Sequence, residues 1–323
     1  MVTLITGAAG FIGFHLINRL LKRGEKIIGI DNLSPYYDVN LKKSRLNILK
    51  ENKNFFYKNV DISDFESLKS CFKEDKITLV CHLAAQAGVR YSLENPAEYV
   101  NTNLVGHFNI LENCKIFGVK NLLYASSSSV YGGNTKIPFS EKDNVDNPVS
   151  LYAATKRSDE LLSSTYSNLY KMNTIGLRFF TVYGPWGRPD MATWIFTERI
   201  LNNQPIKVFN KGNMYRDFTY IDDIIEGTMS IYDFLSNTTN KVISDVYNIG
   251  NNSPVNLLDF INIIESGLGK TATKTMLPMQ LGDVEKTYAD ITKIQTDFNF
   301  KPSTSIKIGV PKFLEWYKKY HKL

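Results

Sequence analysis

The sequence lacks the long apolar runs that a membrane-spanning protein needs. No stretch of its 323 residues reaches the roughly 18 consecutive apolar positions that cross a bilayer. Met1 leads directly into the strand-like Val2-Thr3-Leu4-Ile5, without the basic n-region or the cleavage site of a secretion signal. These absences predict no membrane insertion and a soluble, cytoplasmic protein.

Cysteine and histidine are too few and too scattered for a disulfide framework or a metal cluster. The three cysteines, Cys71, Cys81 and Cys114, stand alone in apolar surroundings, and we expect them to be buried packing residues. The four histidines show no spacing typical of metal ligands. We therefore predict no metal site.

The sequence has no cluster of positive charge except near its C-terminus. The formal net charge is +6, but the basic residues are spread out, apart from Lys318-Lys319-Tyr320-His321-Lys322. That run is typical of a solvated helix end. Nucleic acid is therefore not an expected partner, and a small anionic ligand explains the charge more simply.

The chain does contain a regular alternation of short apolar and longer amphipathic segments. With 43% hydrophobic residues it can bury a large core. The alternation is the pattern of a parallel sheet with helices on both faces. We predict an α/β fold, a Rossmann-type doubly wound parallel sheet of about seven strands. The expected elements are 2–6, 11–22, 26–30, 41–50, 55–60, 65–73, 78–83, 99–117, 121–125, 152–170 and 173–179.

The composition changes after Gly184-Pro185, where prolines become frequent and the elements shorter. This predicts a smaller α/β lobe that binds the substrate. Segments 220–234 and 246–249 again resemble a helix and a strand of the sheet, so we expect one return to the larger lobe. The predicted domains are about 1–180 plus about 217–250, and about 181–216 plus about 251–323.

A glycine-rich segment, Gly7-Ala8-Ala9-Gly10-Phe11-Ile12-Gly13, stands between the first expected strand and helix. Small residues there let backbone amides reach a pyrophosphate at the helix N-terminus. The next strand ends at Asp31, whose carboxylate suits the ribose hydroxyls of NAD and repels the 2′-phosphate of NADP. Asp61 either meets the adenine or belongs to a helix cap around Ser63. NAD is the predicted cofactor.

Tyr152 and Lys156 lie four residues apart at the start of an expected helix, so their side chains share one face. A tyrosine side chain ordinarily has a pKa near 10, so its ionisation at pH 7 costs about 4 kcal/mol. A lysine cation and the positive nicotinamide ring offset that cost. The pair therefore predicts a tyrosinate base that acts on a sugar hydroxyl while hydride leaves the same carbon.

The chain resembles the extended short-chain dehydrogenase/reductase family, in its nucleotide-sugar epimerase branch, over nearly its full length. The glycine loop, Asp31, the serine run 126–129 and the Tyr152/Lys156 pair occur in the family's order. The resemblance implies that Ser127, Tyr152 and Lys156 are catalytic. It implies NAD contacts by Gly7, Gly10, Phe11, Ile12, Gly13, Asp31, Asn32, Asp61, Ile62, Leu83, Ala84, Ala85, Tyr152 and Lys156. It implies UDP-sugar contacts by Arg90, Asn103, Ser127, Ser128, Ser129, Thr181, Arg188, Arg216 and Asp283.

Segments 31–39, 86–92, 178–191 and 279–283 look most like those of UDP-glucuronate 4-epimerases, apart from Leu281, where proline is expected. In related dehydratases an Asp-Glu pair follows the position of Ser127, and in UDP-glucuronate decarboxylases a glutamate stands two residues on. Ser128 and Ser129 occupy those places here. The resemblance thus implies epimerisation of UDP-glucuronate to UDP-galacturonate through a transient 4-keto sugar.

Several alternatives stay open at this point. Thr287 is small where a bulky residue would exclude an N-acetyl group, which allows UDP-N-acetylglucosamine or its uronate as substrate. A UDP-glucuronate decarboxylase and a non-catalytic NAD-binding regulator are further alternatives. Arg216 binds the diphosphate or pairs with a nearby aspartate, and Arg90 and Arg188 are ligand contacts or plain surface residues.

The oligomeric state is predicted from two helices. Segments 99–117 and 152–170 carry apolar residues on more than one face. In the family that the chain resembles, this pair of helices forms a dimer interface, which implies a homodimer. Ordinary packing against the sheet is the alternative explanation.

Overall fold

The computed structural model consists of two compact units, each assembled from three separate segments of chain. It describes residues 1–73, 76–238, 241–279 and 284–323. The first unit comprises residues 1–133, 143–178 and 225–247. The second unit comprises residues 134–142, 179–224 and 248–323. The domain bounds expected from the sequence stay a prediction.

A seven-stranded sheet runs through the first unit, in the order β10, β6, β5, β4, β1, β2 and β3. Neighbouring strands from β5 to β3 pair in parallel. The predicted fold class is confirmed. The strands are β1 (Val2–Thr6), β2 (Lys26–Ile30), β3 (Phe55–Lys58), β4 (Leu79–His82), β5 (Asn121–Ser127), β6 (Asn173–Phe179) and β10 (Ser244–Ile249).

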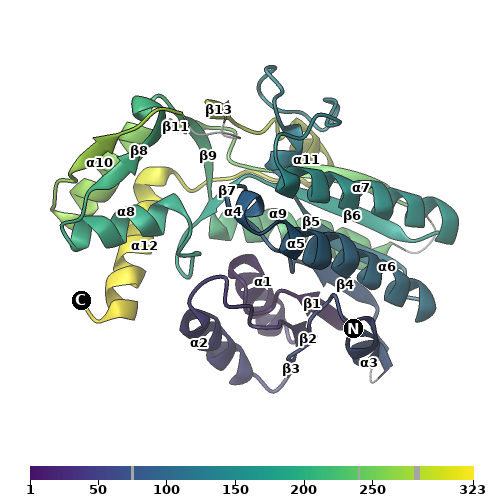
Figure 1. Ribbon diagram of the computed structural model, residues 1–323. Helices are drawn as coiled ribbons and strands as arrows, with labels where there is room; N and C mark the ends of the chain where they lie inside the picture. The colour runs from purple at the N-terminus through teal and green to yellow at the C-terminus, as the bar shows by residue number, and fades with distance from the viewer. Residues whose placement is uncertain (74–75, 239–240, 280–283) are drawn as a thin grey trace. The chain divides into compact units, whose positions relative to one another are not determined.

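Helices connect these strands, and Figure 1 shows α5, α6 and α7 running side by side. The helices are α1 (Phe11–Lys22), α2 (Val39–Lys50), α3 (Phe65–Lys73), α4 (Tyr91–Glu94), α5 (Pro96–Tyr99), α6 (Gly106–Ile116), α7 (Leu151–Tyr170) and α9 (Ile221–Asn237). In the described part of the chain, no helix has the length and apolar character that crossing a membrane requires.

The central strands are buried along most of their length because helices cover both faces of a parallel sheet. Every residue of β4 is buried, as are the last four residues of β1 and of β2. Since parallel strands end at the same edge, the residues that follow β1, β2, β4 and β5 are gathered there. Ligands of open α/β sheets bind at this carboxyl edge.

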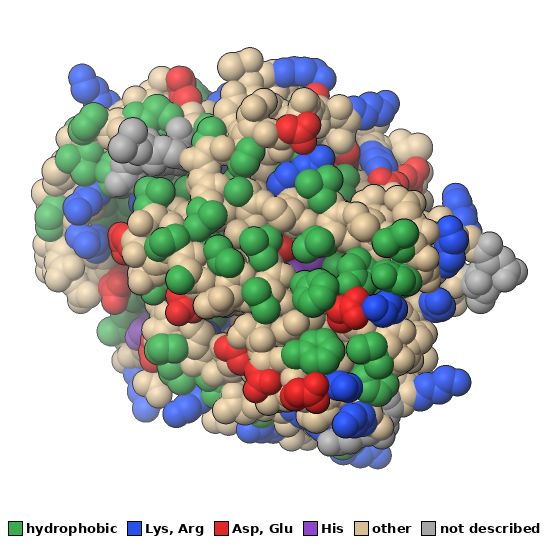
Figure 2. All heavy atoms as spheres, turned by 45° about the vertical axis from the view of Figure 1, so that its right-hand side comes forward, with side chains coloured by type: hydrophobic (Ala, Val, Ile, Leu, Met, Phe, Trp, Pro, Cys, Tyr) green, Lys and Arg blue, Asp and Glu red, His purple; other side chains and the backbone are tan. Residues whose placement is uncertain are grey.

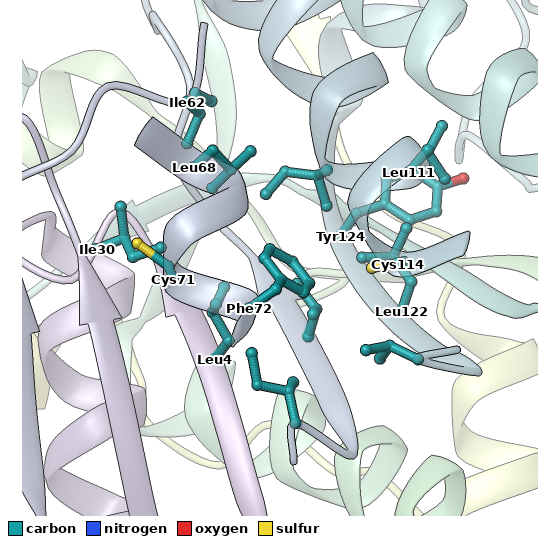
Figure 3. Close-up of a cluster of buried hydrophobic side chains, with 14 of the residues drawn as sticks. Leu4, Ile30, Ile62, Leu68, Cys71, Phe72, Leu111, Cys114, Leu122 and Tyr124 are labelled. Atoms are coloured by element: carbon teal, nitrogen blue, oxygen red, sulfur yellow. The ribbon is translucent and has the colours of Figure 1, made fainter. Parts of the chain in front are cut away.

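The core of the first unit lies between the sheet and two helices. Figure 3 shows Leu4 and Ile30 from the sheet close to Leu68 and Phe72 of α3, with Leu111 of α6 in another part of the same cluster. All are buried, and each such side chain contributes about 1.5–3 kcal/mol by leaving water. The three cysteines are buried and form no disulfide, as expected of packing residues.

The helix expected over 99–117 contains a π-helical turn, η1 (Val100–Val105), between α5 and α6. This turn places Asn103 in the interior, where it is 1% exposed. Single π-helical turns inside α-helices often accompany functional sites.

The second unit is built around β9, which pairs antiparallel with β11 and parallel with β7 and β13. Its strands are β7 (Thr181–Tyr183), β8 (Ile206–Val208), β9 (Tyr215–Tyr220), β11 (Pro254–Asn256), β12 (Lys274–Met276) and β13 (Lys286–Thr287). Its helices are α8 (Ala192–Leu201), α10 (Leu257–Leu268), α11 (Thr292–Phe298) and α12 (Ile306–His321).

Candidate active site

The glycine loop after β1 is packed so closely that its three glycine positions admit no side chain. Gly7 has a φ of +73°, and a Cβ there would lie 2.8 Å from the backbone nitrogen of Ala84. A Cβ on Gly13 would lie 2.1 Å from the carbonyl oxygen of Gly7. Gly10 is the N-cap residue of α1, and among the described residues no side chain caps that helix. The first amides of α1 are thus available to an anion.

Asp31, directly after β2, is tied to this loop. It is 8% exposed, and its Oδ2 accepts a hydrogen bond from the backbone nitrogen of Ala9 at 3.0 Å. Its Oδ1 accepts one from Leu33 N at 2.8 Å. The carboxylate is therefore fixed beside the glycine loop, where the ribose of a dinucleotide is expected.

Asp61 and Asn32 bond to each other at the same edge of the sheet. Asn32 Nδ2 donates to Asp61 Oδ2 at 2.8 Å, and Ser63 donates its backbone N–H and its hydroxyl to Asp61 Oδ1. Burial alone would raise the pKa of Asp61, but the bonds from Ser63 and Asn32 hold it below its ordinary value. Asp64, not Ser63, caps α3 by accepting from Ser67 N at 3.1 Å.

Arg45 of α2 is a loop contact that the sequence analysis missed. It is fully buried, and its Nη1 donates to the carbonyl oxygen of Ala9 at 2.7 Å and to the Tyr37 hydroxyl at 2.8 Å. It thus supports the glycine loop from the side of α2. Its place in a basic amphipathic segment gave no signal of this role.

The residues after β4 are held by β1 and by the π-helical turn. Ala84 N donates to Thr6 Oγ1 at 3.1 Å. Asn103 accepts from Gln86 N at 2.8 Å and donates from Nδ2 to Gln86 O and to Thr155 Oγ1. Its side chain therefore fastens the loop after β4 to α7, while its contact with the sugar stays a prediction. Ile62 is buried nearby, with its carbonyl bonded by Asn109.

Tyr152 and Lys156 lie in the first turns of α7. Ser150 caps this helix by accepting a hydrogen bond from Ala153 N at 3.1 Å. Lys156 is 2% exposed, and its ammonium donates to the carbonyl oxygen of Ala125 in β5 at 3.0 Å and to Asp159 Oδ2 at 3.0 Å. The structure therefore docks the lysine of the pair directly on the strand that ends in the serines.

The serines at the end of β5 form a capped turn. Ser127 Oγ accepts a hydrogen bond from Ser129 N at 3.2 Å and donates to Ser129 Oγ at 3.2 Å. It thereby caps the short helix η2 (Ser128–Tyr131). Ser128 and Ser129 remain partly exposed. The turn therefore presents hydroxyl groups at the carboxyl edge of the sheet.

Two buried histidines lie beneath the Lys156 site. His82 bonds Thr6 Oγ1 at 2.7 Å, and His107 bonds Ser163 Oγ at 2.8 Å. Burial, together with the nearby Lys156 cation, lowers the pKa of His107 to about 3. Burial, with smaller effects of His107 and Lys156, lowers the pKa of His82 well below its ordinary value. Both imidazoles are therefore neutral in the folded protein. Among the residues that the structure describes, no group of three or more potential ligands is placed to hold a metal ion.

We expect the protein to lose stability as the pH falls below about 6.5, because these histidines take up protons only on unfolding. For His107 alone the loss reaches about 2–3 kcal/mol near pH 4.5. Replacing His107 with glutamine should flatten the pH dependence of the urea midpoint, whereas His321→Gln, at an exposed position, should not. Burial raises the pKa of Asp159 to about 6, which acts in the opposite sense, so each variant is compared with the wild type. Parallel curves for His107→Gln and wild type would contradict this account.

The remaining predicted substrate residues lie mainly in the second unit. Thr181 begins β7 and pairs with Phe218 of β9. Arg216 of β9 donates to the carbonyl oxygens of Tyr215 and Glu285 at 2.9 and 3.1 Å. Arg188 forms a bidentate ion pair with Asp190, with N···O distances of 2.9 and 2.5 Å. Asp283 lies outside the described residues.

In the first unit, Arg90 is exposed at the start of α4. The predicted cofactor residues Phe11 and Ile12 begin α1, and Leu83 and Ala85 follow β4. None of these positions contradicts its expected role, and each role stays a prediction.

Comparison with known proteins identifies the family. The model of the NAD dependent epimerase/dehydratase family matches residues 3–250. The chain belongs to this family. It is 50% identical to "Protein CapI" of Staphylococcus aureus, over 100% of both chains. It is 45% identical to the "Probable UDP-glucuronate 4-epimerase" of Rhizobium meliloti, over 99% of this chain and 97% of that one.

A solved structure of the epimerase/dehydratase type agrees with this assignment. UDP-glucuronic acid 4-epimerase from Bacillus cereus, in complex with UDP-glucuronic acid and NAD, superimposes with a TM-score of 0.91. It is 36% identical, over 99% of this chain and 100% of that chain. The resemblance inferred from the sequence motifs is confirmed.

The first unit has the features that an NAD dependent family requires. Gly7 and Gly13 let the loop, α1 and the segment after β4 pack at distances that a Cβ would prevent, and Asp31 is fixed beside the loop. Backbone amides of the loop and of α1 suit the pyrophosphate, and the Asp31 carboxylate suits the ribose hydroxyls. The residues present therefore fit NAD.

Proposed function

We propose that this protein is an NAD-dependent 4-epimerase that converts UDP-glucuronate to UDP-galacturonate through a transient 4-keto sugar. The Tyr152/Lys156 pair on α7 is the observation that carries this proposal, because Lys156 is docked on the strand that ends in Ser127. The likeness to the Bacillus cereus enzyme supports the choice of substrate. Product analysis by NMR, after incubation with UDP-glucuronate, tests it.

The catalytic roles follow from the chemistry of the three side chains. NAD, when bound, supplies the acceptor for the hydride of carbon 4 and its later return to the opposite face. The Tyr152 phenol oxygen takes the proton of the 4-hydroxyl and gives it back. The Lys156 ammonium holds positive charge beside that exchange, and the Ser127 hydroxyl bonds the same sugar oxygen.

Oxidation at carbon 4 of a glucuronate makes a β-keto acid, which tends to lose carbon dioxide. An epimerase must therefore hold the carboxylate without supplying a proton. We assign this task to hydroxyls and backbone amides of Ser127, Ser128, Ser129 and Thr181, which bond a carboxylate as neutral donors. Arg90, Arg188, Arg216 and Asp283 belong to the same proposal, as contacts of the carboxylate, the diphosphate and the uridine ribose.

Ser129→Glu is expected to add decarboxylation to the reaction. A glutamic acid two residues after Ser127 places a proton donor where the wild type has only a hydroxyl, and general acid catalysis is worth about 10²–10⁴-fold. We expect the UDP-pentose product to rise at least about tenfold above the wild-type level, measured by NMR. Ser129→Gln, of equal size but without an acidic proton, is the matched control. Equal product ratios in the two variants would refute this role for position 129.

UDP-N-acetylglucosamine, or its uronate, is the alternative substrate. Thr287 of β13 pairs with Arg216 of β9, so a small residue stands next to a predicted diphosphate contact. Direct competition between UDP-glucuronate and UDP-N-acetylglucosamine separates the two proposals.

We also propose a homodimer formed through α6 and α7. Each of the two helices carries exposed apolar side chains. On α6 and the turn before it they recur at helical spacing, and on α7 two of them lie eight residues apart. Figure 2, in which the side carrying these helices comes forward, shows hydrophobic side chains gathered across this face. They are Val105, Phe108 and Ile116, and Leu161 and Leu169. Separately, we propose that the protein is cytoplasmic, as the sequence led us to expect.

Light scattering is expected to give twice the mass of one chain. Leu161→Glu, at a position 53% exposed, should produce monomers because a charge would be buried at the interface. Ile308→Glu, at a position 52% exposed in the second unit, should leave the dimer intact. A monomeric wild type would refute the dimer.

A further inference from the structure

Glu160 of α7 lies one helical turn after Lys156 and two turns after Tyr152, so the three side chains stand on the same side of the helix. Lys156 Nζ donates to the carbonyl oxygen of Ala125 at 3.0 Å. Ser126 Oγ donates to Glu160 Oε1 at 2.6 Å. The helix is thus bonded to β5 through the two consecutive residues that directly precede Ser127.

Arg178 of β6 continues these contacts to the other end of the serine turn, which we define as residues 126–131. Its Nε and Nη2 donate to the two carboxylate oxygens of Glu160, each at 2.8 Å. Its Nη1 donates to the hydroxyl of Tyr131 at 3.0 Å, and its guanidinium lies 4.9 Å from the centre of the Tyr131 ring. One ion pair therefore holds Ser126 at the start of the turn and Tyr131 at its end.

The ion pair is buried and charged. Both side chains are 2% exposed. Burial alone would raise the pKa of Glu160, but Arg178, together with Ser126 and Arg157, holds it below its ordinary value. Burial alone would lower the pKa of Arg178, whereas the Glu160 carboxylate raises it.

A buried ion pair is weak evidence for stability, because apolar residues of equal volume often serve the fold as well. What apolar residues cannot supply are the outward hydrogen bonds to Ser126 and Tyr131. Those bonds fix the turn relative to the helix that carries Tyr152 and Lys156. The Ser127 side chain takes no part in these hydrogen bonds, because neighbouring side chains on a strand point to opposite faces.

We propose that Glu160 and Arg178 are positioning residues for epimerisation, which hold the serine turn in register with Tyr152 and Lys156 through Ser126 and Tyr131. This inference rests on the proposed function for the identity of the reaction. A displacement of the reacting groups by about 1 Å costs on the order of 10²-fold in rate. A small movement of the serine turn relative to Tyr152 and Lys156 therefore lowers kcat.

Substitution of Glu160 or Arg178 leaves an unpaired buried charge and threatens folding. Ser126→Ala and Tyr131→Phe avoid this, because each removes one hydroxyl and leaves the ion pair intact. We expect each to lower kcat about tenfold and the double variant about a hundredfold, with KM changed less than about threefold. We also expect faster hydrogen exchange of the amides of residues 127–131 in the NAD-loaded double variant.

Ser167→Ala is the matched control, since Ser167 is a buried serine of α7 whose hydroxyl bonds the carbonyl oxygen of Ile243 at 3.3 Å. It should leave kcat and the exchange of residues 127–131 unchanged. Turnover is measured with whichever UDP-sugar the wild type converts, and hydrogen exchange needs no substrate. If only the substrate assignment is wrong, the variants still show lower kcat and faster exchange. If the positioning role is wrong, they do not. A double variant with wild-type kcat, or with wild-type exchange of the turn, would overturn the inference.

Discussion

Tyr152→Phe is expected to lower kcat by about 10²–10⁴-fold while leaving the binding of NAD and UDP-glucuronate nearly unchanged. The substitution removes one oxygen, the atom that we assign to proton transfer at the 4-hydroxyl. The ring keeps its edge contact with Tyr99, whose centre lies 6.0 Å away. The bonds of Lys156 to Ala125 and Asp159 do not involve the phenol. Turnover followed by NMR, with binding measured by calorimetry, checks both parts.

Tyr170→Phe provides the control for this result, because Tyr170 is a partly exposed tyrosine at the end of the same helix. It should retain wild-type turnover. If Tyr152→Phe retained more than about a tenth of the wild-type kcat, another group would have to be the base.

Gly13→Ala is expected to abolish NAD binding and to destabilise the fold. The new Cβ would lie 2.1 Å from the carbonyl oxygen of Gly7, and a backbone atom cannot turn aside as a side chain can. The start of α1 and the glycine loop must then separate, which displaces the amides that we assign to the pyrophosphate. Overpacking of this kind costs about 1–3 kcal/mol. The cofactor content after purification and the free energy of unfolding measure the two effects.

Gly24→Ala, just after the C-terminal end of α1, is the control for Gly13→Ala. It tests the cost of backbone conformation alone, without a steric clash. Gly24 has a φ of +82°, and a Cβ there would meet nothing within 4 Å. We expect a cost of about 1–2 kcal/mol from the left-handed backbone conformation, with full retention of NAD. If Gly13→Ala retained NAD as well as Gly24→Ala does, the role assigned to the glycine loop in NAD binding would be wrong.

Much of the fold was predictable because its signals are local. The strands β1, β2 and β6 and the helices α1 and α3 begin and end at the predicted residues. In each, an apolar run or amphipathic period defines one element. The π-helical turn at Val100–Val105 gave no such signal, because the contacts of Asn103 with Gln86 and Thr155 arise only in the folded chain.

The candidate site was predictable to the extent that its residues sit in continuous motifs. The glycine loop and the Tyr152/Lys156 pair are of this kind. Arg45 supports a loop 36 residues before it, and Arg178 meets Tyr131 47 residues earlier, so neither role can be seen in a local pattern. Long-range side-chain bonds of this sort require the tertiary structure.

The most direct test of the central claim is to incubate the purified protein with UDP-glucuronate and follow the sugar signals by NMR. The account predicts that UDP-galacturonate appears as the only new nucleotide sugar and approaches a fixed ratio with its precursor, without net consumption of NAD. Formation of UDP-pentose as the main product, or no conversion of UDP-glucuronate while UDP-N-acetylglucosamine is epimerised, would contradict it.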